Sequence, residues 1–244
     1  MTDSVIGDFW EKLERINRSD SVGELQSAFM DALAPVGFHA AYFLVPVAAD
    51  PTVGRSLTNM GFDAEWERRY REEFYRIDPL PLIGMTRQTA FRWPEDVNFS
   101  ILTKKQRAYM DMLKHYRMSR GLAVVCFGPF ARCGFVGIDC ADFKESIDPE
   151  RRLKAETCAR VAFRRYVRLV QPFEEQVPAL SGRETEVLHL LAEGRSNKTI
   201  AQKLEISPSS VDVYVQRLFS KLGVSDRTTA SVRALSLGLI VSAD

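Results

Sequence analysis

The chain has 244 residues, which is enough for one medium and one small domain, each with its own core. Apolar residues make up 45% and charged residues 27%, with no long apolar run, which excludes a membrane-spanning or disordered class. The net charge of +1 excludes DNA binding through bulk positive charge, and the charged N-terminus is unlike a secretory signal, so we expect a cytoplasmic protein without a membrane partner.

Apolar periodicity predicts an irregular alternation of helices and strands over residues 1–170. Helices are expected over 3–18, from a capped start at Ser21 to Pro35, over 63–76, over 102–121 with a glycine at its end, and over 149–170. Strands are expected over 40–47 and in a hairpin of GLAVVCF and CGFVGIDCA around residues 128–130. This alternation predicts an antiparallel sheet with helices packed on it.

The segment QPFEEQVP (171–178) contains two prolines and no periodicity, and it predicts a domain boundary. We expect three parts: residues 1–170, a linker over 171–179, and a helical part over 180–244. Four short helices of the last part begin at the capping residues Ser181, Ser196, Ser207 and the 225–226 pair. The turn over 205–207 gives the second and third helices the spacing of a helix-turn-helix.

The helical part also carries a motif that runs over most of residues 180–240. Its members are Glu184, Leu188, Gly194, Ser196-Asn197-Lys198, Ile200-Ala201, Ser207, Val211 and Lys221-Leu222-Gly223-Val224. This pattern resembles the LuxR/GerE-type tetrahelical domain. The resemblance implies binding to double-stranded DNA, with the second helix of the helix-turn-helix in the major groove.

Residue chemistry divides the predicted DNA contacts of this domain into three groups. A helix N-terminus suited to a phosphate holds Ser196, Asn197 and Lys198. Side chains that can line the DNA backbone are Ser209, Ser210, Tyr214, Arg217 and Lys221. Side chains expected to face base edges are Asp212, Val213 and Gln216. Members of the LuxR/GerE-type family often have basic residues at the positions held here by Asp212 and Gln216. One copy of this domain should therefore bind DNA weakly. We expect a homodimer that binds a palindromic site.

A second set of residues lies in the N-terminal part: Trp66-x3-Tyr70, Asp78-Pro79, Trp93 and Gly121. Their types and spacings resemble the autoinducer-binding domain of quorum-sensing LuxR-type regulators. The resemblance implies a small-molecule autoinducer, an N-acyl-homoserine lactone. In that case Trp66 donates to the lactone carbonyl, Asp78 accepts from the ligand amide, and Tyr70 and Trp93 pack on the ring and the start of the acyl chain.

Two departures from that family concern the polar head of the ligand. The step from Tyr70 to Asp78 is one residue shorter than usual, so the helix end between them must be rebuilt. Phe62, which we also assign to the ligand site, stands where the family has a tyrosine and lacks its hydroxyl. The acyl tail is expected between sheet and helices, against Phe43, Val125 and Phe127.

Together these features predict an α+β fold: an N-terminal α/β/α sandwich with an antiparallel sheet, then an all-α tetrahelical helix-turn-helix domain. The expected function is a ligand-responsive transcriptional regulator without a cofactor. It is not expected to be an enzyme, because the sequence lacks a nucleophile–base pair, a phosphate loop or metal-ligand spacing, and its four cysteines are scattered. Open alternatives are a ligand-independent or non-lactone-sensing regulator, and a heterodimerising protein-interaction module that inhibits a related regulator. Helix 149–170 is either a dimer contact or simply packed on the sheet.

Overall fold

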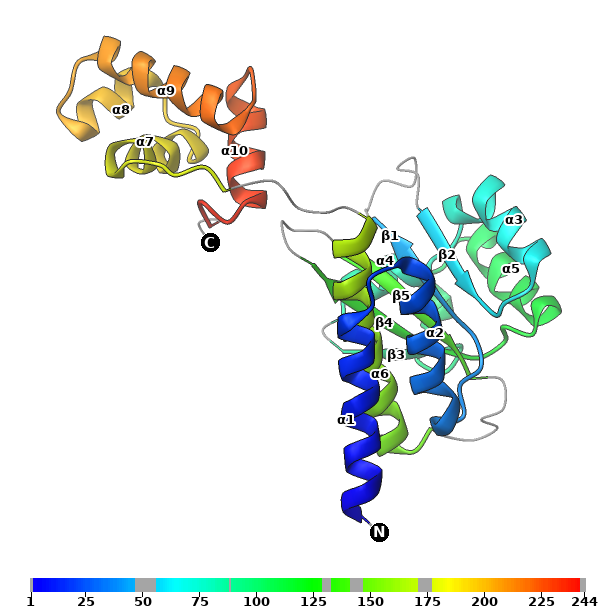
Figure 1. The fold of residues 1–244 in the computed structure, drawn as a ribbon. Helices are drawn as coiled ribbons and strands as arrows, with labels where there is room; N and C mark the ends of the chain where they lie inside the picture. The colour runs from blue at the N-terminus through cyan, green and yellow to red at the C-terminus, as the bar shows by residue number, and fades with distance from the viewer. Residues whose placement is uncertain are drawn as a thin grey trace. The chain divides into compact units, whose positions relative to one another are not determined.

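A computed structural model of the chain describes residues 2–46, 56–87, 89–128, 133–140, 147–170 and 177–241. These residues form two compact units, 2–170 and 177–241 (Figure 1). The predicted hairpin turn at 129–130, residue 47, most of the predicted linker 171–179 and residues 242–244 lie outside the described residues.

The N-terminal unit is built on one antiparallel sheet whose strands follow the order β2-β1-β5-β4-β3. The strands are β1 (Ala41–Val45), β2 (Ser56–Met60), β3 (Phe91–Trp93), β4 (Gly121–Phe127) and β5 (Cys133–Asp139). The predicted strand near 40–47 and the predicted hairpin are confirmed, and β4 and β5 lie side by side within the sheet. Strands β2 and β3 were not predicted; both lie at edges of the sheet.

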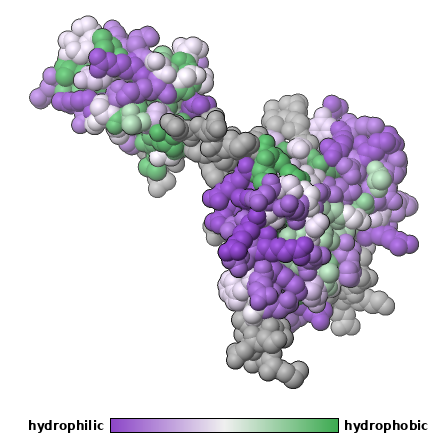
Figure 2. All heavy atoms as spheres, viewed as in Figure 1, coloured by the Kyte–Doolittle hydropathy of each residue, from purple (hydrophilic) through white to green (hydrophobic). Residues whose placement is uncertain are grey.

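Helices cover both faces of this sheet (Figure 1). One face carries α1 (Thr2–Arg18), α2 (Val22–Leu33) and α6 (Pro149–Val170). The other carries α3 (Ala64–Glu72), α4 (Leu80–Met85) and α5 (Lys104–Met112). In the view of Figure 2, the outward sides of α1 and α3 are largely hydrophilic. The predicted α/β/α sandwich, and with it the α+β class, is confirmed.

The predicted helix 102–121 is wrong at its C-terminal end. Helix α5 ends at Met112, a 3₁₀ turn continues over Leu113–Tyr116, and Arg117 takes a left-handed conformation with φ of 56°. Gly121 was predicted both to close this helix and to begin the strand GLAVVCF; only the second is confirmed, because Gly121 begins β4. Helix α4 was not predicted; Pro79 is its N-cap and Pro81 lies in its first turn, where a missing N–H is tolerated.

Alternation along the strands decides which side chains face which layer. On β1, Tyr42 joins the aromatic cluster under α3, whereas Phe43 packs against Phe29 and Tyr166 on the opposite face, at ring distances of 5.4 and 5.2 Å. Phe127 is 69% exposed at the end of β4. Of the residues expected along an acyl tail, only Val125 lies in the core cluster on the α3–α5 side.

The C-terminal unit contains α7 (Gly182–Ala192), α8 (Asn197–Leu204), α9 (Pro208–Leu222) and α10 (Arg227–Ser236). Each of the N-caps Ser181, Ser196, Ser207 and Asp226 accepts a hydrogen bond from the backbone N–H three residues later. These caps satisfy donors that a helix end leaves free, so the four predicted starts are confirmed. Within the described ranges, no helix combines the length and apolar character required to cross a membrane.

Candidate ligand pocket and DNA interface

Helix α3 places Trp66 and Tyr70 side by side in the core. Asp63 begins the helix by accepting from the backbone N–H groups of Glu65 and Trp66. The four-residue spacing then puts Trp66 and Tyr70 on one helix face, where both side chains are fully buried and their rings lie 5.2 Å apart. Phe62 extends this row, with its ring 5.7 Å from that of Trp66. These three predicted ligand residues therefore form one continuous aromatic row.

Asp78 joins this row through the turn that follows α3. A 3₁₀ turn over Phe74–Arg76 replaces the last helical turn, which is how the chain accommodates the short step from Tyr70 to Asp78. The Tyr70 hydroxyl donates to Asp78 Oδ2 at 2.9 Å, and the Leu80 N–H donates to Asp78 Oδ1 at 3.0 Å. A buried carboxylate requires such donors, and Asp78 is only 3% exposed.

Trp93 belongs to the same core cluster but is held by different contacts. It pairs with Gly121 across β3 and β4, and its ring occupies the space above that glycine. A Cβ at position 121 would lie 1.9 Å from the Trp93 ring, so the glycine is needed for the ring to fit. The Trp93 indole N–H donates to the Met118 carbonyl at 3.0 Å. Trp93 can therefore supply a wall to a ligand, while its N–H is engaged within the protein.

Two other polar groups of this cluster have no partner in the described part of the chain. They are the indole N–H of Trp66 and the hydroxyl of Tyr109, which reaches the cluster from α5. Burial raises the pKa of Tyr109 well above its usual value, and the nearby Asp78 carboxylate adds to this shift. Tyr109 was not singled out from the sequence; the aromatic periodicity of residues 102–121 was its only signal.

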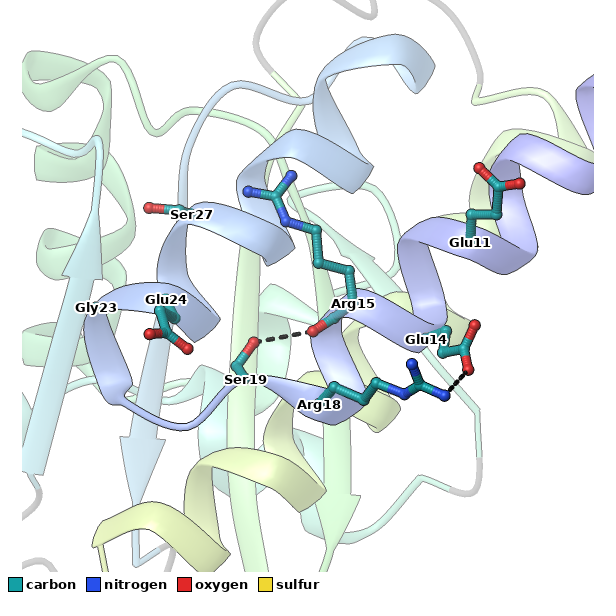
Figure 3. A pocket seen from close by; sticks show the side chains of 8 residues that line it. All are labelled: Glu11, Glu14, Arg15, Arg18, Ser19, Gly23, Glu24 and Ser27. Atoms are coloured by element: carbon teal, nitrogen blue, oxygen red, sulfur yellow. Dashed lines mark hydrogen bonds and ion pairs between the residues drawn. The ribbon is translucent and has the colours of Figure 1, made fainter.

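A surface hollow between α1 and α2 is a poor alternative place for an acyl ligand. Its lining is mostly charged or polar, as Figure 3 shows: Glu11, Glu14, Arg15, Arg18, Ser19, Gly23, Glu24 and Ser27. Arg18 forms an ion pair with Glu14 at 2.6 Å, and the Ser19 hydroxyl donates to the Arg15 carbonyl at 3.0 Å. An acyl chain needs apolar walls, so this hollow does not fit the predicted ligand.

In the C-terminal unit, α8, the turn and α9 have the predicted helix-turn-helix spacing. Glu205 ends α8 in a left-handed conformation, and Ser207 caps α9 through the Ser210 N–H at 3.0 Å. The hydroxyl of Ser207 also lies 2.8 Å from the hydroxyls of Ser209 and Ser210. Predicted DNA contacts with exposed side chains are Ser196, Lys198, Ser209, Asp212, Val213, Gln216, Arg217 and Lys221. The side chain of Tyr214 is partly buried, with the Arg217 guanidinium 5.9 Å from its ring.

Asp212 and Asn197 are bonded to each other across α8 and α9. The side-chain amide of Asn197 donates through Nδ2 to Asp212 Oδ1 at 2.7 Å, and its Oδ1 accepts from the Arg227 guanidinium at 3.3 Å. Arg227 also donates to the Arg195 carbonyl. This network orients the Asp212 carboxylate, which the sequence alone did not indicate.

Lys221 has an internal role that was not predicted. Its ammonium donates to Glu184 Oε2 at 2.7 Å and to the Ala179 carbonyl at 2.9 Å. Glu184 also accepts from the Ser181 N–H at 2.7 Å, which completes the capping box of α7. The bond from Lys221 lowers the pKa of Glu184 to about 2, with the Ser181 bond as the next cause. Two of the three ammonium protons of Lys221 therefore serve the domain itself, and its contact with a phosphate stays a prediction.

The chain thus combines an α/β/α sandwich, which has polar groups buried in its aromatic core, with a capped helix-turn-helix unit. A model of the family described as "Autoinducer binding domain" matches residues 21–166, and that of "Bacterial regulatory proteins, luxR family" matches residues 178–234. The chain belongs to the LuxR-type family of quorum-sensing transcriptional regulators.

Curated relatives agree with this family. EsaR, a transcriptional activator protein of Pantoea stewartii subsp. stewartii, is 25% identical over 88% of this chain and 91% of its own length. The putative regulator y4qH of Sinorhizobium fredii is 28% identical over 72% of this chain. The chain spans only 54% of y4qH and 29% of the Mycobacterium tuberculosis NarL protein, to which it is 49% identical over 63 residues.

Solved structures show the same fold along nearly the whole chain. SdiA in complex with octanoyl-rac-glycerol is 20% identical, with a TM-score of 0.71 over 98% of each chain. The lactone-dependent LuxR-family factor CepR2 of Burkholderia cenocepacia is 14% identical, with a TM-score of 0.54 over 68% of this chain and 98% of its own. At these identities the likeness concerns the fold.

Proposed function

We propose that this protein senses an N-acyl-homoserine lactone and, as a dimer, binds a palindromic operator. In this proposal residues 1–170 hold the ligand, residues 171–179 link the domains, and residues 180–244 read DNA in the cytoplasm. The observation that carries the ligand proposal is the group of polar atoms in an otherwise apolar core under α3. The Trp66 N–H lacks an acceptor among the described residues, and the Asp78 carboxylate lies beside the same aromatic row.

These atoms match the polar head of an acyl-homoserine lactone. Trp66 offers a donor for the lactone carbonyl, and Asp78 can accept from the ligand amide in addition to its bonds from Tyr70 and Leu80. Phe62, Tyr70 and Trp93 would supply aromatic walls around this head. The similarity in fold to CepR2, a factor that depends on N-acylhomoserine lactone, supports this choice of ligand.

An acylglycerol is the second candidate ligand. SdiA, whose fold covers nearly the whole chain, was solved with octanoyl-rac-glycerol. Phe62 favours this alternative, because the aromatic row lacks a hydroxyl at that position and so offers one polar contact fewer to a lactone head. Both candidates have an acyl chain and a carbonyl oxygen, and this oxygen can accept a hydrogen bond from the Trp66 indole N–H.

Thermal unfolding of the full chain with a panel of lactones and acylglycerols tests the proposal. A ligand that binds only the folded state at a hundredfold excess over Kd stabilises it by about 2.7 kcal/mol. We expect one lactone chain length to raise the melting temperature most. A larger shift with acylglycerols would select the second candidate, and no shift with either would reject ligand sensing of this kind.

Dimeric DNA binding needs a separate test. Two linked copies gain effective concentration on a palindrome, which compensates for an acidic residue on the predicted recognition helix. Sedimentation and DNA binding by the purified homodimer address this. A chain that binds no DNA alone but forms mixed dimers with a related regulator would act as an inhibitory interaction module instead.

A further inference from the structure

Tyr109 has a hydroxyl that the fold of the N-terminal unit does not use. Its side chain is 1% exposed, and its oxygen has no hydrogen-bond partner among the described residues. Buried hydroxyls in folded proteins are nearly always bonded, so an unbonded one requires an explanation. The Tyr109 ring itself is well packed, for example edge-on against Phe74 at 5.6 Å. The ring therefore serves the core, while the hydroxyl is unexplained by packing.

The second unbonded group of this core, the Trp66 indole N–H, lies beside the first. It is close enough to the Tyr109 oxygen to oppose the rise in the pKa of Tyr109, yet the two do not reach hydrogen-bond geometry. An indole N–H can only donate, and a tyrosine hydroxyl can donate as well. The Asp78 carboxylate nearby already accepts from Tyr70 and from the Leu80 N–H. Two neighbouring donors thus remain without an acceptor of their own among the described residues.

We propose that the hydroxyl of Tyr109 is a ligand-binding and specificity-determining group of this sensor, donating with Trp66 to one carbonyl oxygen of the buried ligand. A carbonyl oxygen has two lone pairs and can accept from both donors at once. Because Phe62 lacks a hydroxyl, Tyr109 supplies one to the site from a different helix, α5. This inference rests on the proposed function, and it concerns the carbonyl shared by lactones and acylglycerols.

The variant Tyr109→Phe tests this inference, because it removes only the hydroxyl. Removing a buried hydroxyl without a partner should leave the melting temperature of the ligand-free chain unchanged or raise it. The same variant should weaken the binding of N-octanoyl-homoserine lactone or 1-octanoylglycerol about tenfold, the loss of one hydrogen bond. Isothermal titration calorimetry with each probe gives the Kd, and scanning fluorimetry gives the melting temperature.

Tyr166→Phe is the matched control. The Tyr166 hydroxyl is also in the core region but lies 2.7 Å from the Thr58 hydroxyl, and its ring packs on the opposite face of the sheet. This control should lower the melting temperature of the ligand-free chain and leave both Kd values unchanged. Tyr109→Phe and Tyr166→Phe are therefore expected to differ in both measurements.

The outcomes separate this inference from the proposed function. If the wild type binds a probe and Tyr109→Phe binds it equally well, the role of Tyr109 is overturned while ligand sensing stands. A Tyr109→Phe chain that loses stability as Tyr166→Phe does, or fails to fold, would show that the hydroxyl is structural and also overturn it. If no member of the lactone and acylglycerol panel binds the wild type, the proposed function fails and this inference fails with it. A larger loss for one probe identifies which head group Tyr109 selects.

Discussion

The two units of this protein differ in how completely their buried polar groups are hydrogen-bonded. In the C-terminal unit, Glu184 is 3% exposed and accepts bonds from Ser181 and Lys221 of its own domain. In the N-terminal unit, Trp66 and Tyr109 are buried with donors that meet no acceptor among the described residues. The first arrangement stabilises a domain that must present a fixed surface. Under the proposed function, the second leaves hydrogen-bonding capacity for the ligand.

Residues that are equally buried can therefore have different roles, depending on whether their hydrogen bonds are complete. A buried group whose bonds are complete contributes to folding, so its loss should reduce stability. A buried group whose bonds are incomplete lowers the stability of the ligand-free chain. Under the proposed function, the ligand supplies its missing partner. Substitutions in the two units should therefore change different measured quantities.

Glu184→Gln should have the largest effect on stability. The change removes the charge that Lys221 faces and leaves the ammonium half-buried without its carboxylate, at a cost of about 2–3 kcal/mol. Hydrogen exchange of the amides of α7 and α9 in the full chain measures this loss. Glu186→Gln is the control, because the Glu186–Arg183 pair is half exposed and should contribute little. Equal protection in both variants would contradict a structural role for Glu184.

The same residue predicts a pH dependence. The folded pKa of Glu184 is about 2, below its ordinary value of 4.5, because the Lys221 bond favours the charged form. A carboxyl with a lowered folded pKa stabilises the fold fully above pH 4.5, and this contribution is lost as the pH falls through about 2. Protection of α7 should decline over this window in the wild type and decline less in Glu184→Gln. A parallel decline in both would assign the acid sensitivity to other groups.

Asp78→Asn should have the next largest effect, and it should affect ligand binding as well as stability. The charged carboxylate accepts from Tyr70 and Leu80, and bonds to a charged group contribute about 1.5–3 kcal/mol. Tyr70→Phe removes one donor and keeps the charge. We therefore expect Asp78→Asn to lose more of the lactone-induced rise in melting temperature than Tyr70→Phe. The reverse order would mean that the ligand contacts Tyr70 directly.

The units also differ in how far their structure follows from sequence. The C-terminal helices begin at Ser181, Ser196, Ser207 and Asp226, and a cap acts within three residues, so local patterns were sufficient. In the N-terminal unit, β3 is three residues long and depends on pairing with β4. Gly121 was predicted to end a helix as well as to begin a strand, but it only begins β4, where it admits the Trp93 ring. A glycine suits both places equally well, and only tertiary packing distinguishes them.

The candidate sites show the same limit. Trp66 and Tyr70 share one face of α3 through their helical spacing, and the resemblance to the autoinducer-binding domain singled them out together with Phe62, which precedes the helix. The bond from Lys221 to Glu184 joins residues 37 apart in sequence, and no periodicity relates them. Tyr109 was missed for another reason. An aromatic residue at helical spacing is typical of a core, and only its unbonded hydroxyl distinguishes it from its neighbours.

Gln216→Ala tests a side chain of the C-terminal unit that is predicted to contact DNA and has no role in the described internal bonds of that unit. Gln216 is exposed on α9, outside the internal bonds that occupy Lys221 and Glu184. An amide that pairs with one adenine contributes about 1–3 kcal/mol of discrimination, so its loss should relax preference at one base position. Selection of binding sites from a random DNA pool measures this. A uniform loss across all sequences would place Gln216 against a phosphate instead.

Asp212→Lys should have the smallest effect on the fold and a distinct effect on DNA binding. Asp212 is exposed, but its carboxylate accepts from Asn197, so the change both reverses a charge and frees the amide of Asn197. If the side chain faces the duplex, removing a repelled carboxylate and adding a cation should tighten non-specific binding. The slope of log K against log salt should steepen by up to about one unit, the value for one added phosphate contact.

Asp212→Asn separates the two contributions, because it removes the charge and retains an oxygen that can accept from Asn197. A slope that is unchanged in both variants would show that the side chain at position 212 points away from DNA. The hydrogen bonds between Asn197 and Asp212 would then stabilise the C-terminal unit, as those of Glu184 do.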